Sequence, residues 1–594
     1  MSTPMIPVTE QANELTMELD LADAEGITRL FRQGDTQLFA GFRTFPCLMD
    51  DEILLKAAAT AVAATKAIKA GEKGRILLSG AGTSGRFAHL ICRQFNRFLR
   101  ASGKKEVFAP LVAGGALALV KAQEGAEDDP IQAVGDMNNR LSNQMESILY
   151  VGITCGLSAP YIAGQLWALK DNTHATSVLM GFNPRECARN VTVEGWDQTF
   201  LSALEAAEKS ADRFILLNPV YGPETIHGST RMKGGTATKI LLEAIFFSAL
   251  ELAGLNKQAD THLNPDDLDN EERIALRIKN LLRQCRETIQ YTYEHQSILQ
   301  ELIRLAGSSL RRGERIFYLG RETAGIMGLI DASECPPTFG ATFDDIRCFI
   351  NDGWQDLMDN PKEDHANAGP EFQIDLTSFE RNKLEDLVKG DSVFGIAIGE
   401  LGPNTRAVLE HASKTKAHVG LIIINSSKTL PPDLPIPLEN CYLIEIPSLG
   451  FIPGFVNLAE LALKITLNTI SSGAHIMVGK IYNNRMIDLK ISNNKLYYRA
   501  IRTISILANV DEEAAKTSLH RAVFQTDALN NAQAEAIPSV VIQASTQVNR
   551  VVPTALLLAQ GSMTYDQALE MLSRDPVPRR VINSVLNGPD EADS

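Results

Sequence analysis

The sequence predicts an α/β protein in which two copies of a parallel-sheet domain are followed by a C-terminal helical region. Two glycine-rich turns indicate the duplication, since Arg75–Gly85 (RILLSGAGTSG) and Arg315–Gly325 (RIFYLGRETAG) each join an apolar strand to a helix. Around both turns, short apolar runs alternate with helical patterns, which is typical of a parallel sheet flanked by helices. The length of 594 residues also exceeds what one hydrophobic core usually supports.

The first copy contains four apolar runs that predict strands and three amphipathic stretches that predict helices. The expected strands are Ile76–Ser79, Ile148–Thr154, Ser177–Gly181 and Phe214–Leu217, and the expected helices are Phe87–Leu99, Ala159–Leu169 and Gly235–Leu250. The polar, acidic stretch Asn256–Arg273 then predicts a linker into a long helix that runs through Ile303.

The same pattern returns in the second copy and stops near Asn494. The expected strands are Ile316–Leu319, Val393–Ile398 and Val419–Ile424, with helices at Asn404–Ala412 and Leu458–Ser471. Beyond this, Lys495–Val510, Glu512–Phe524, Val551–Ala559 and Tyr565–Leu572 predict a helical lid. The predicted domains are therefore 1–50 (an N-terminal helical segment), 51–270, 271–493 and 494–594, the last with a short disordered tail from Asn587.

Composition and charge exclude several classes of function. A net charge of −15 with no basic stripe argues against nucleic-acid binding. The eight cysteines include no CxxC pair, so neither a zinc site nor a disulfide framework is expected, and no metal or cofactor is predicted. The N-terminus does not resemble a secretory signal, and every apolar run is shorter than the ~20 residues that span a bilayer. We therefore expect a cytoplasmic protein that does not bind membranes.

The first glycine turn has the features of a phosphate-binding loop. Gly80, Gly82 and Gly85 make backbone amides accessible at a helix N-terminus, and the hydroxyls of Thr83 and Ser84 follow. A dinucleotide fold uses similar glycines, but the acidic ribose ligand of such folds has no obvious place here. The turn thus favours a phosphomonoester over NAD.

Two further segments place hydroxyls at predicted helix starts. Thr154, Cys155, Gly156 and Ser158 follow the second predicted strand, and Gly228–Gly235 (GSTRMKGG) carries Ser229 together with Arg231 and Lys233, which could neutralise a dianion. Simple helix capping is the alternative for both. Parallel strands bring their carboxyl ends to one crevice, so these segments are expected to face the first turn.

These motifs resemble the sugar isomerase (SIS) family of phosphosugar-binding domains, whose sheets are flavodoxin-like. GAGTSGR, GLSAPYIAGQ, GFNP, GSTRMKGGTATK and GAHIMVGKIYNNRMIDLKISNNKL extend the resemblance, from about Leu15 to Leu586, to the glucokinase regulatory protein family. That family combines two SIS domains with a helical lid and derives from N-acetylmuramic acid 6-phosphate etherase. The resemblance implies two tandem SIS domains, 51–270 and 271–493, followed by the lid.

The resemblance also implies which residues bind the sugar phosphate. They are Thr83, Ser84, Glu127, Thr154, Cys155, Gly156, Ser158, Glu334 and Lys495. Ser229 and Arg231 of the GSTRMKGG segment complete the predicted binding site. Glu127 in EGAED and Glu334 in DASECPPTFG match the acid/base pair proposed for the etherase, and here they come from different copies. The second copy has Arg321 and Glu322 in place of Ala81 and Gly82, and acidic repulsion there would exclude a phosphate. One composite site per chain is expected.

Two functions remain open at this stage. As a regulator, the protein would bind fructose 6-phosphate, fructose 1-phosphate or a related hexose phosphate and act as an inhibitor of a glucokinase or hexokinase in carbohydrate metabolism. As an enzyme, it would be an N-acetylmuramic acid 6-phosphate etherase that releases D-lactate through Glu127 and Glu334. An aldose–ketose isomerase or aminosugar deaminase is a weaker third reading. An exposed Leu449/Phe451 pair is a candidate partner surface, local packing being the alternative. A monomer is plausible, because the two SIS domains can pair within the chain.

Overall fold

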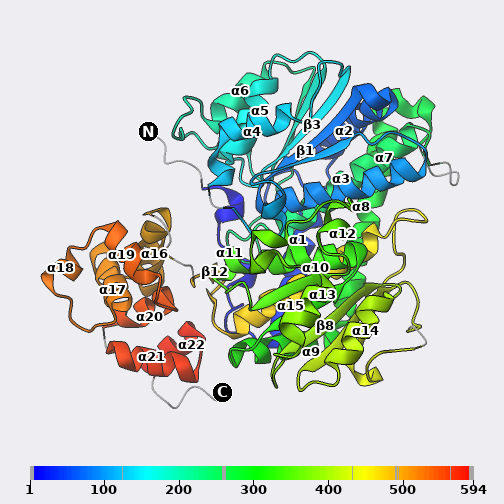
Figure 1. Ribbon diagram of the computed structural model, residues 1–594. Helices are drawn as coiled ribbons and strands as arrows, with labels where there is room; N and C mark the ends of the chain where they lie inside the picture. The colour runs from blue at the N-terminus through cyan, green and yellow to red at the C-terminus, as the bar shows by residue number, and fades with distance from the viewer. Residues whose placement is uncertain are drawn as a thin grey trace.

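The computed structural model describes residues 6–587 except 124, 257–262, 431–432, 489–490, 492–493 and 562, and it leaves the side chains of 494, 495, 586 and 587 undescribed. The predicted disordered tail lies beyond these residues. Two sheet-containing domains are stacked on each other, and a group of helices coloured orange to red lies to one side of both (Figure 1).

The first domain is a five-stranded parallel sheet in the order β2-β1-β3-β4-β5. Its strands are β1 (Gly74–Gly80), β2 (Phe108–Val112), β3 (Ser147–Ile153), β4 (Ala175–Met180) and β5 (Phe214–Leu217). Its helices are α2 (Asp51–Ala70), α3 (Gly82–Ala101), α4 (Pro130–Asn138), α5 (Pro160–Leu169), α6 (Phe200–Glu208) and α7 (Lys233–Leu252). The four predicted strands are confirmed. The edge strand β2 was not predicted, since Pro110 interrupts its pattern.

The second domain repeats this topology in the order β7-β6-β8-β9-β10. Its strands are β6 (Ile316–Gly320), β7 (Ile346–Ile350), β8 (Ser392–Ile398), β9 (His418–Asn425) and β10 (Cys441–Glu445). Its helices are α8 (Glu271–Glu294), α9 (Gln296–Arg311), α10 (Glu322–Ser333), α11 (Cys335–Phe339), α12 (Trp354–Met358), α13 (Leu376–Phe379), α14 (Pro403–Ala412) and α15 (Asn457–Met477). The predicted long helix through Ile303 is wrong in one respect: the chain leaves helical geometry at His295, which separates α8 from α9.

A helical lid with its own apolar core completes the chain. A short hairpin, β11 (Ile481–Tyr482) and β12 (Arg485–Met486), leads into it. Its helices are α16 (Asn494–Ala508), α17 (Glu512–Phe524), α18 (Asn531–Ala534), α19 (Pro538–Ser545), α20 (Val551–Ala559), α21 (Tyr565–Arg574) and α22 (Pro578–Asn587). Its buried apolar side chains, among them Leu519 and Leu556, form a cluster separate from that of the two sheet domains. The fold class is therefore confirmed: two tandem parallel-sheet domains and a C-terminal helical lid.

The N-terminal segment (residues 8–21) joins the first domain to the lid. Asn183 donates to the Thr9 hydroxyl at 2.9 Å, while Arg579 of α22 donates to the carbonyl of Met17 and to Asp20, both at 3.0 Å. Helix α1 (Ala24–Ala40) follows and packs against α9. Hydrogen bonds thus connect the N-terminal segment to the last helix of the lid.

The interface between the sheet domains is reciprocal. Lys239 of α7 donates to the carbonyl of Asn457 at the start of α15, and Lys464 of α15 donates to the carbonyl of Met232 before α7, at 3.3 and 2.7 Å. The two lysines are 225 residues apart in the sequence, and so are Met232 and Asn457, whose carbonyls they contact. The two contacts are therefore equivalent in the two copies. The duplicated domains therefore pair face to face about an internal pseudo-two-fold axis, with α3, α7, α10 and α15 in the interface.

Candidate functional site

The first glycine turn is built for close approach of the backbone. A Cβ on Gly80 would lie 2.7 Å from the amide nitrogen of Gly85, so no larger residue fits there. Gly82 has a φ of +52°, and α3 begins at this residue without a side-chain cap. Thr83 and Ser84 are buried behind it. The N-terminus of α3 thus retains amides that no side chain of the described residues caps.

The segment after β3 packs directly against this turn. The Sγ atom of Cys155 lies 3.8 Å from Oγ of Ser84, and Asn183 holds the carbonyl of Cys155 at 2.8 Å. Thr154 uses its hydroxyl locally, accepting from the amide of Ser158 at 3.3 Å, and Gly156 lies between them in the same turn. Burial, and then the nearby Glu224 carboxylate, raise the pKa of Cys155 to about 12, which excludes a reactive thiolate.

The GSTRMKGG segment approaches from the other side. The start of α7 is capped by the buried carboxylate of Glu224, which accepts from the amides of Lys233 and Gly234, each at 2.9 Å. This carboxylate already satisfies the helix N-terminus, so no external anion is needed there. Lys233 turns inward to Gln37 at 2.7 Å. Ser229 is only 4% exposed, and its hydroxyl has no partner among the described residues.

Arg231 points across the domain interface. Its guanidinium donates to the hydroxyls of Ser471 and Ser472 of α15 at 2.8 and 2.7 Å, and lies 3.7 Å from the carboxylate of Asp331 of α10. These contacts orient Arg231 away from the first turn and into the second domain.

Glu334 makes the opposite crossing. It follows α10 of the second domain, yet its carboxylate forms a buried ion pair with Arg86 of α3. The place where a Cβ on Gly82 would stand is 3.9 Å from its Oε1 atom. Arg86 is itself fixed by donating to the carbonyl of Leu119 at 3.0 Å. Glu334 of the second copy therefore lies beside the turn of the first copy.

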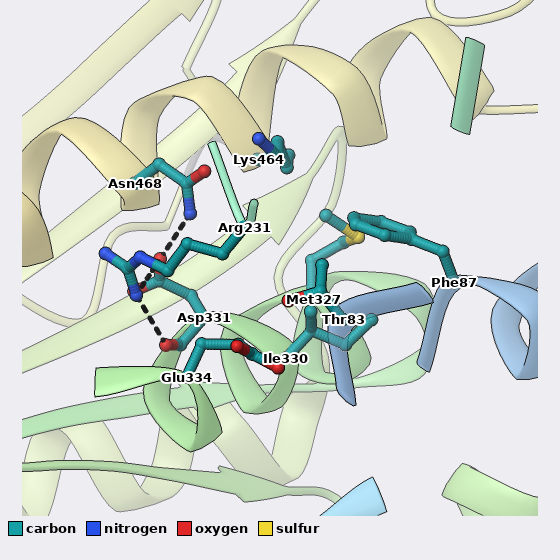
Figure 2. Close-up of a pocket in the computed structure, with 9 residues that line it drawn as sticks. All are labelled: Thr83, Phe87, Arg231, Met327, Ile330, Asp331, Glu334, Lys464 and Asn468. Carbon is teal, nitrogen blue, oxygen red and sulfur yellow. Dashed lines mark hydrogen bonds and ion pairs between the residues drawn. The ribbon is translucent and has the colours of Figure 1, made fainter. Parts of the chain in front are cut away.

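These crossings enclose a small cavity between the domains, whose volume of about 10 Å³ is room for about one water molecule (Figure 2). It is lined by Thr83, Phe87, Arg231, Met327, Ile330, Asp331, Glu334, Lys464 and Asn468. Thr83 comes from the first turn, Lys464 and Asn468 from α15, and the two acids from α10 and its end. The lining thus combines hydrogen-bond donors with carboxylates, the groups that bind phosphate oxygens and sugar hydroxyls, in a space too small for a whole hexose phosphate.

Lys464 is the most unusual member of this lining. Burial lowers its pKa to about 8, although the carboxylates of Asp35 and Glu224 favour the charged form. It is held at the carbonyl of Met232 and the hydroxyl of Thr236, both at 2.7 Å. A cation placed in this way could stabilise an anionic ligand without itself being exposed to solvent.

Of the eleven predicted site residues, Thr83, Arg231 and Glu334 line the cavity. Glu127 is exposed, in a short 3₁₀ turn (Ala126–Asp128), and does not belong to the lining. The side chain of Lys495 lies outside the described residues. Neither residue is therefore placed near Glu334 by this structure.

Sequence reasoning missed Arg86, Lys464 and Asn468. Arg86 belonged to the quoted GAGTSGR motif, but its partner is 248 residues away. Lys464 did carry a signal, because a lysine in the apolar stripe of a predicted helix is seldom solvent-exposed and needs a buried partner. Asn468 follows it one turn later on the same face.

The comparisons with known proteins match this arrangement domain by domain. Family models match the N-terminal SIS domain of glucokinase regulatory protein at residues 59–170, its second SIS domain at 293–478 and its C-terminal lid domain at 483–582. Human glucokinase regulatory protein is 33% identical over 98% of this chain and 93% of its own length. The chain belongs to the glucokinase regulatory protein family.

More distant relatives follow this family. N-acetylmuramic acid 6-phosphate etherase 1 of Bacillus licheniformis is 31% identical over 42% of this chain and 74% of its own length. Among solved structures, the C-terminal domain of glucosamine-fructose-6-phosphate aminotransferase from Francisella tularensis aligns with a TM-score of 0.43 and 13% identity, over 77% of this chain and 98% of that one.

Two other kinds of site, a membrane span and a metal centre, are absent from the described residues. Among them, no helix combines the length and apolar character that a bilayer crossing requires. No group of three or more His, Cys, Asp or Glu side chains in the described part of the chain is arranged to hold a metal ion.

Proposed function

We propose that the protein is a phosphosugar-binding regulator, which takes fructose 6-phosphate or a related hexose phosphate between its two SIS domains and controls a sugar kinase. The observation that carries the proposal is the uncapped N-terminus of α3, faced from the second domain by Glu334. The phosphate would accept from the amides after Gly82 and from the hydroxyls of Thr83 and Ser84. Glu334 would accept a hydrogen bond from a sugar hydroxyl.

The test uses the two copies as each other's control. Fructose 6-phosphate and fructose 1-phosphate should bind by titration calorimetry and raise the melting temperature, while fructose should not. Thr83→Val should weaken binding about ten-fold or more through the loss of one charge-assisted hydrogen bond. Thr323→Val, the equivalent change in the second copy, should leave affinity unchanged. If no hexose phosphate binds, the proposal is wrong.

Control of a kinase is supported by family membership, since the similar human protein is named for regulating glucokinase. The predicted partner surface does not add support. Leu449 and Phe451 are half-buried rather than exposed, and the Phe451 ring packs 5.0 Å from that of Phe247. Local packing, the alternative considered above, explains this pair. Inhibition of a glucokinase or hexokinase by the purified protein, with and without hexose phosphate, tests this half directly.

A second candidate is the etherase, favoured by the retained DASECPPTFG segment and the burial of its Glu334 beside the first turn. The Glu334 carboxylate is paired with Arg86 of the first domain, which holds it beside the first turn. Incubation with N-acetylmuramic acid 6-phosphate followed by a D-lactate assay decides between the candidates. Lactate release that Glu127→Gln or Glu334→Gln abolishes would establish the enzyme, whereas binding without release would favour the regulator.

A further inference from the structure

A group of arginines gathers where the lid meets the GSTRMKGG loop. The amide of His227 donates to the carbonyl of Asn484 at 2.8 Å, and His227 forms a parallel bridge with Arg485 of β12. Gly228 follows with a φ of +74°, and a Cβ there would lie 3.8 Å from an Nη atom of Arg499 of α16. The loop thus passes directly beneath the first lid helix.

Arg485 and Arg499 lie at this junction, and the exposed Arg502 is near enough to Arg485 to repel it. The three are here called the arginine cluster. Burial lowers the pKa of Arg485, and repulsion from the other two lowers it further. Burial likewise lowers the pKa of Arg499, where Glu10 is the opposing acid. Among the described residues, none of the three guanidinium groups forms a hydrogen bond or an ion pair. Like charges held together without a bound carboxylate are unfavourable unless an anion joins them.

A second, independent observation lies one residue further along the loop. The hydroxyl of Ser229 is buried, with the residue 4% exposed, and finds no partner in the described structure. A buried hydroxyl without a partner destabilises the fold unless a ligand or water satisfies it. Ser229 and the arginine cluster therefore both lack an acceptor at the same junction.

This junction is close to the first turn. The next residue, Thr230, lies beside Cys155, whose Sγ atom is 3.8 Å from the hydroxyl of Ser84. Gly228 and Thr230 are two residues apart, at most about 7 Å along the backbone. A molecule of the size of a hexose with a substituent at each end could therefore reach both places.

We propose that the arginine cluster and Ser229 bind a second acidic group of the sugar phosphate, so that the preferred ligand is a hexose phosphate that also carries a carboxylate or a second phosphate. This inference rests on the proposed function, because it assumes that the first phosphate occupies the turn before α3. The second acidic group would join the hairpin, the first lid helix and the first SIS domain around one ligand.

Two matched pairs of ligands test the inference on the full chain by titration calorimetry at constant ionic strength. N-acetylmuramic acid 6-phosphate differs from N-acetylglucosamine 6-phosphate by its lactyl carboxylate, and fructose 1,6-bisphosphate differs from fructose 6-phosphate by one phosphate. In at least one pair, the more acidic ligand should have an affinity at least about ten-fold higher than the less acidic one, as expected for charge-assisted hydrogen bonds to guanidinium groups. The pair that responds identifies the source of the acidic group.

Variants then assign the effect to the cluster. Arg499→Gln should remove the higher affinity of the more acidic ligand and leave the affinity of the less acidic ligand of the pair unchanged. Arg499→Lys, which keeps the charge and loses the planar fork, should retain part of the advantage. Arg574→Gln, at an exposed arginine of α21, is the control and should change nothing.

Equal affinity within both pairs overturns the inference while leaving the proposed function intact, because the simple hexose phosphates still bind. An equal loss for all four ligands in Arg499→Gln also overturns it, since the arginine would then act on the shared phosphate or on the fold. Absence of binding by all four ligands contradicts both proposals. The comparison of ligands on the unmodified protein gives an answer even if a variant does not fold.

Discussion

The turn after β1 and the turn after β6 have the same backbone and different surroundings. Gly82 in the first and Glu322 in the second both have a left-handed φ, +52° and +51°. At the first turn the amides stay uncapped. At the second, the amide of Glu322 donates to the carboxylate of Asp356 at 3.3 Å, and the Glu322 side chain pairs with Arg97 of α3 at 2.6 Å.

A second carboxylate, that of Glu460, also distinguishes the turn of the second copy from that of the first. The hydroxyl of Thr323, equivalent to Thr83, donates to Glu460 of α15. The position 225 residues earlier is Gly235, where a Cβ would stand only 3.0 Å from Thr83. The second copy thus fills the place of an anion with its own carboxylates, and the first leaves it to a ligand. The comparison teaches that a duplicated binding loop can become part of a domain interface without changing its fold.

The largest effect is expected from giving the first turn the residue of the second. In Gly82→Glu, a carboxylate would stand at the proposed phosphate position beside Glu334, so hexose phosphate affinity should fall at least about a hundred-fold through repulsion and blocking. Calorimetry with fructose 6-phosphate measures this. Gly82→Asn, which tolerates a left-handed φ and carries no charge, is the control and should lose less. Unchanged affinity in Gly82→Glu would place the ligand elsewhere.

The next effect concerns the ion pair that joins the two copies. Arg86→Gln leaves the Glu334 carboxylate without its buried partner, and the free energy of unfolding should fall by about 3 kcal/mol. Urea denaturation measures the loss. In the double variant with Glu334→Gln, the two losses should be less than additive, because both remove one interaction. Strict additivity would mean that the pair contributes no coupling.

The third effect concerns a buried acid that the first copy has and the second copy lacks. Glu243 on α7 is equivalent to Asn468, which lines the cavity, and burial raises its pKa from 4.5 to about 7. The native state therefore holds a proton more tightly than the unfolded state, so stability should fall as pH rises from 4.5 through 7. Glu243→Gln should flatten this part of the pH profile of the melting temperature. Asp212→Asn, at an exposed acid, should not.

The smallest effect is expected at Glu322. In Glu322→Gly, relief of the left-handed backbone offsets the loss of half-exposed ion pairs, so stability should change by less than about 1 kcal/mol and hexose phosphate affinity not at all. Glu322→Gln separates the two contributions, because it keeps the strain and removes the charge. Thermal denaturation with calorimetric binding checks both. Gain of a second binding site in the glycine variant would show that this residue alone closes the second turn.

The local sequence pattern predicted most of the fold, but it predicted only those parts of the site that lie within one turn of the chain. Runs such as Ile148–Thr154 are apolar on both faces and could be read directly, but β7, with Arg347 and Cys348 in its centre, could not, since its burial depends on packing. Thr83 and Ser84 follow a recognisable turn. The partners that cross the interface, Arg86 with Glu334 above all, are set by how two distant helices pack, which no local pattern contains.

The hydrogen bonds between the N-terminal segment and α22 have a consequence for folding during synthesis. Residues 8–21 are synthesised long before Arg579, which donates hydrogen bonds to Met17 and Asp20. Domains fold as units during translation, so both sheet domains can be folded before α22 is available to bind residues 8–21. A chain truncated before α22 would lack that fastening, and its loosened N-terminus would become an early target for proteases.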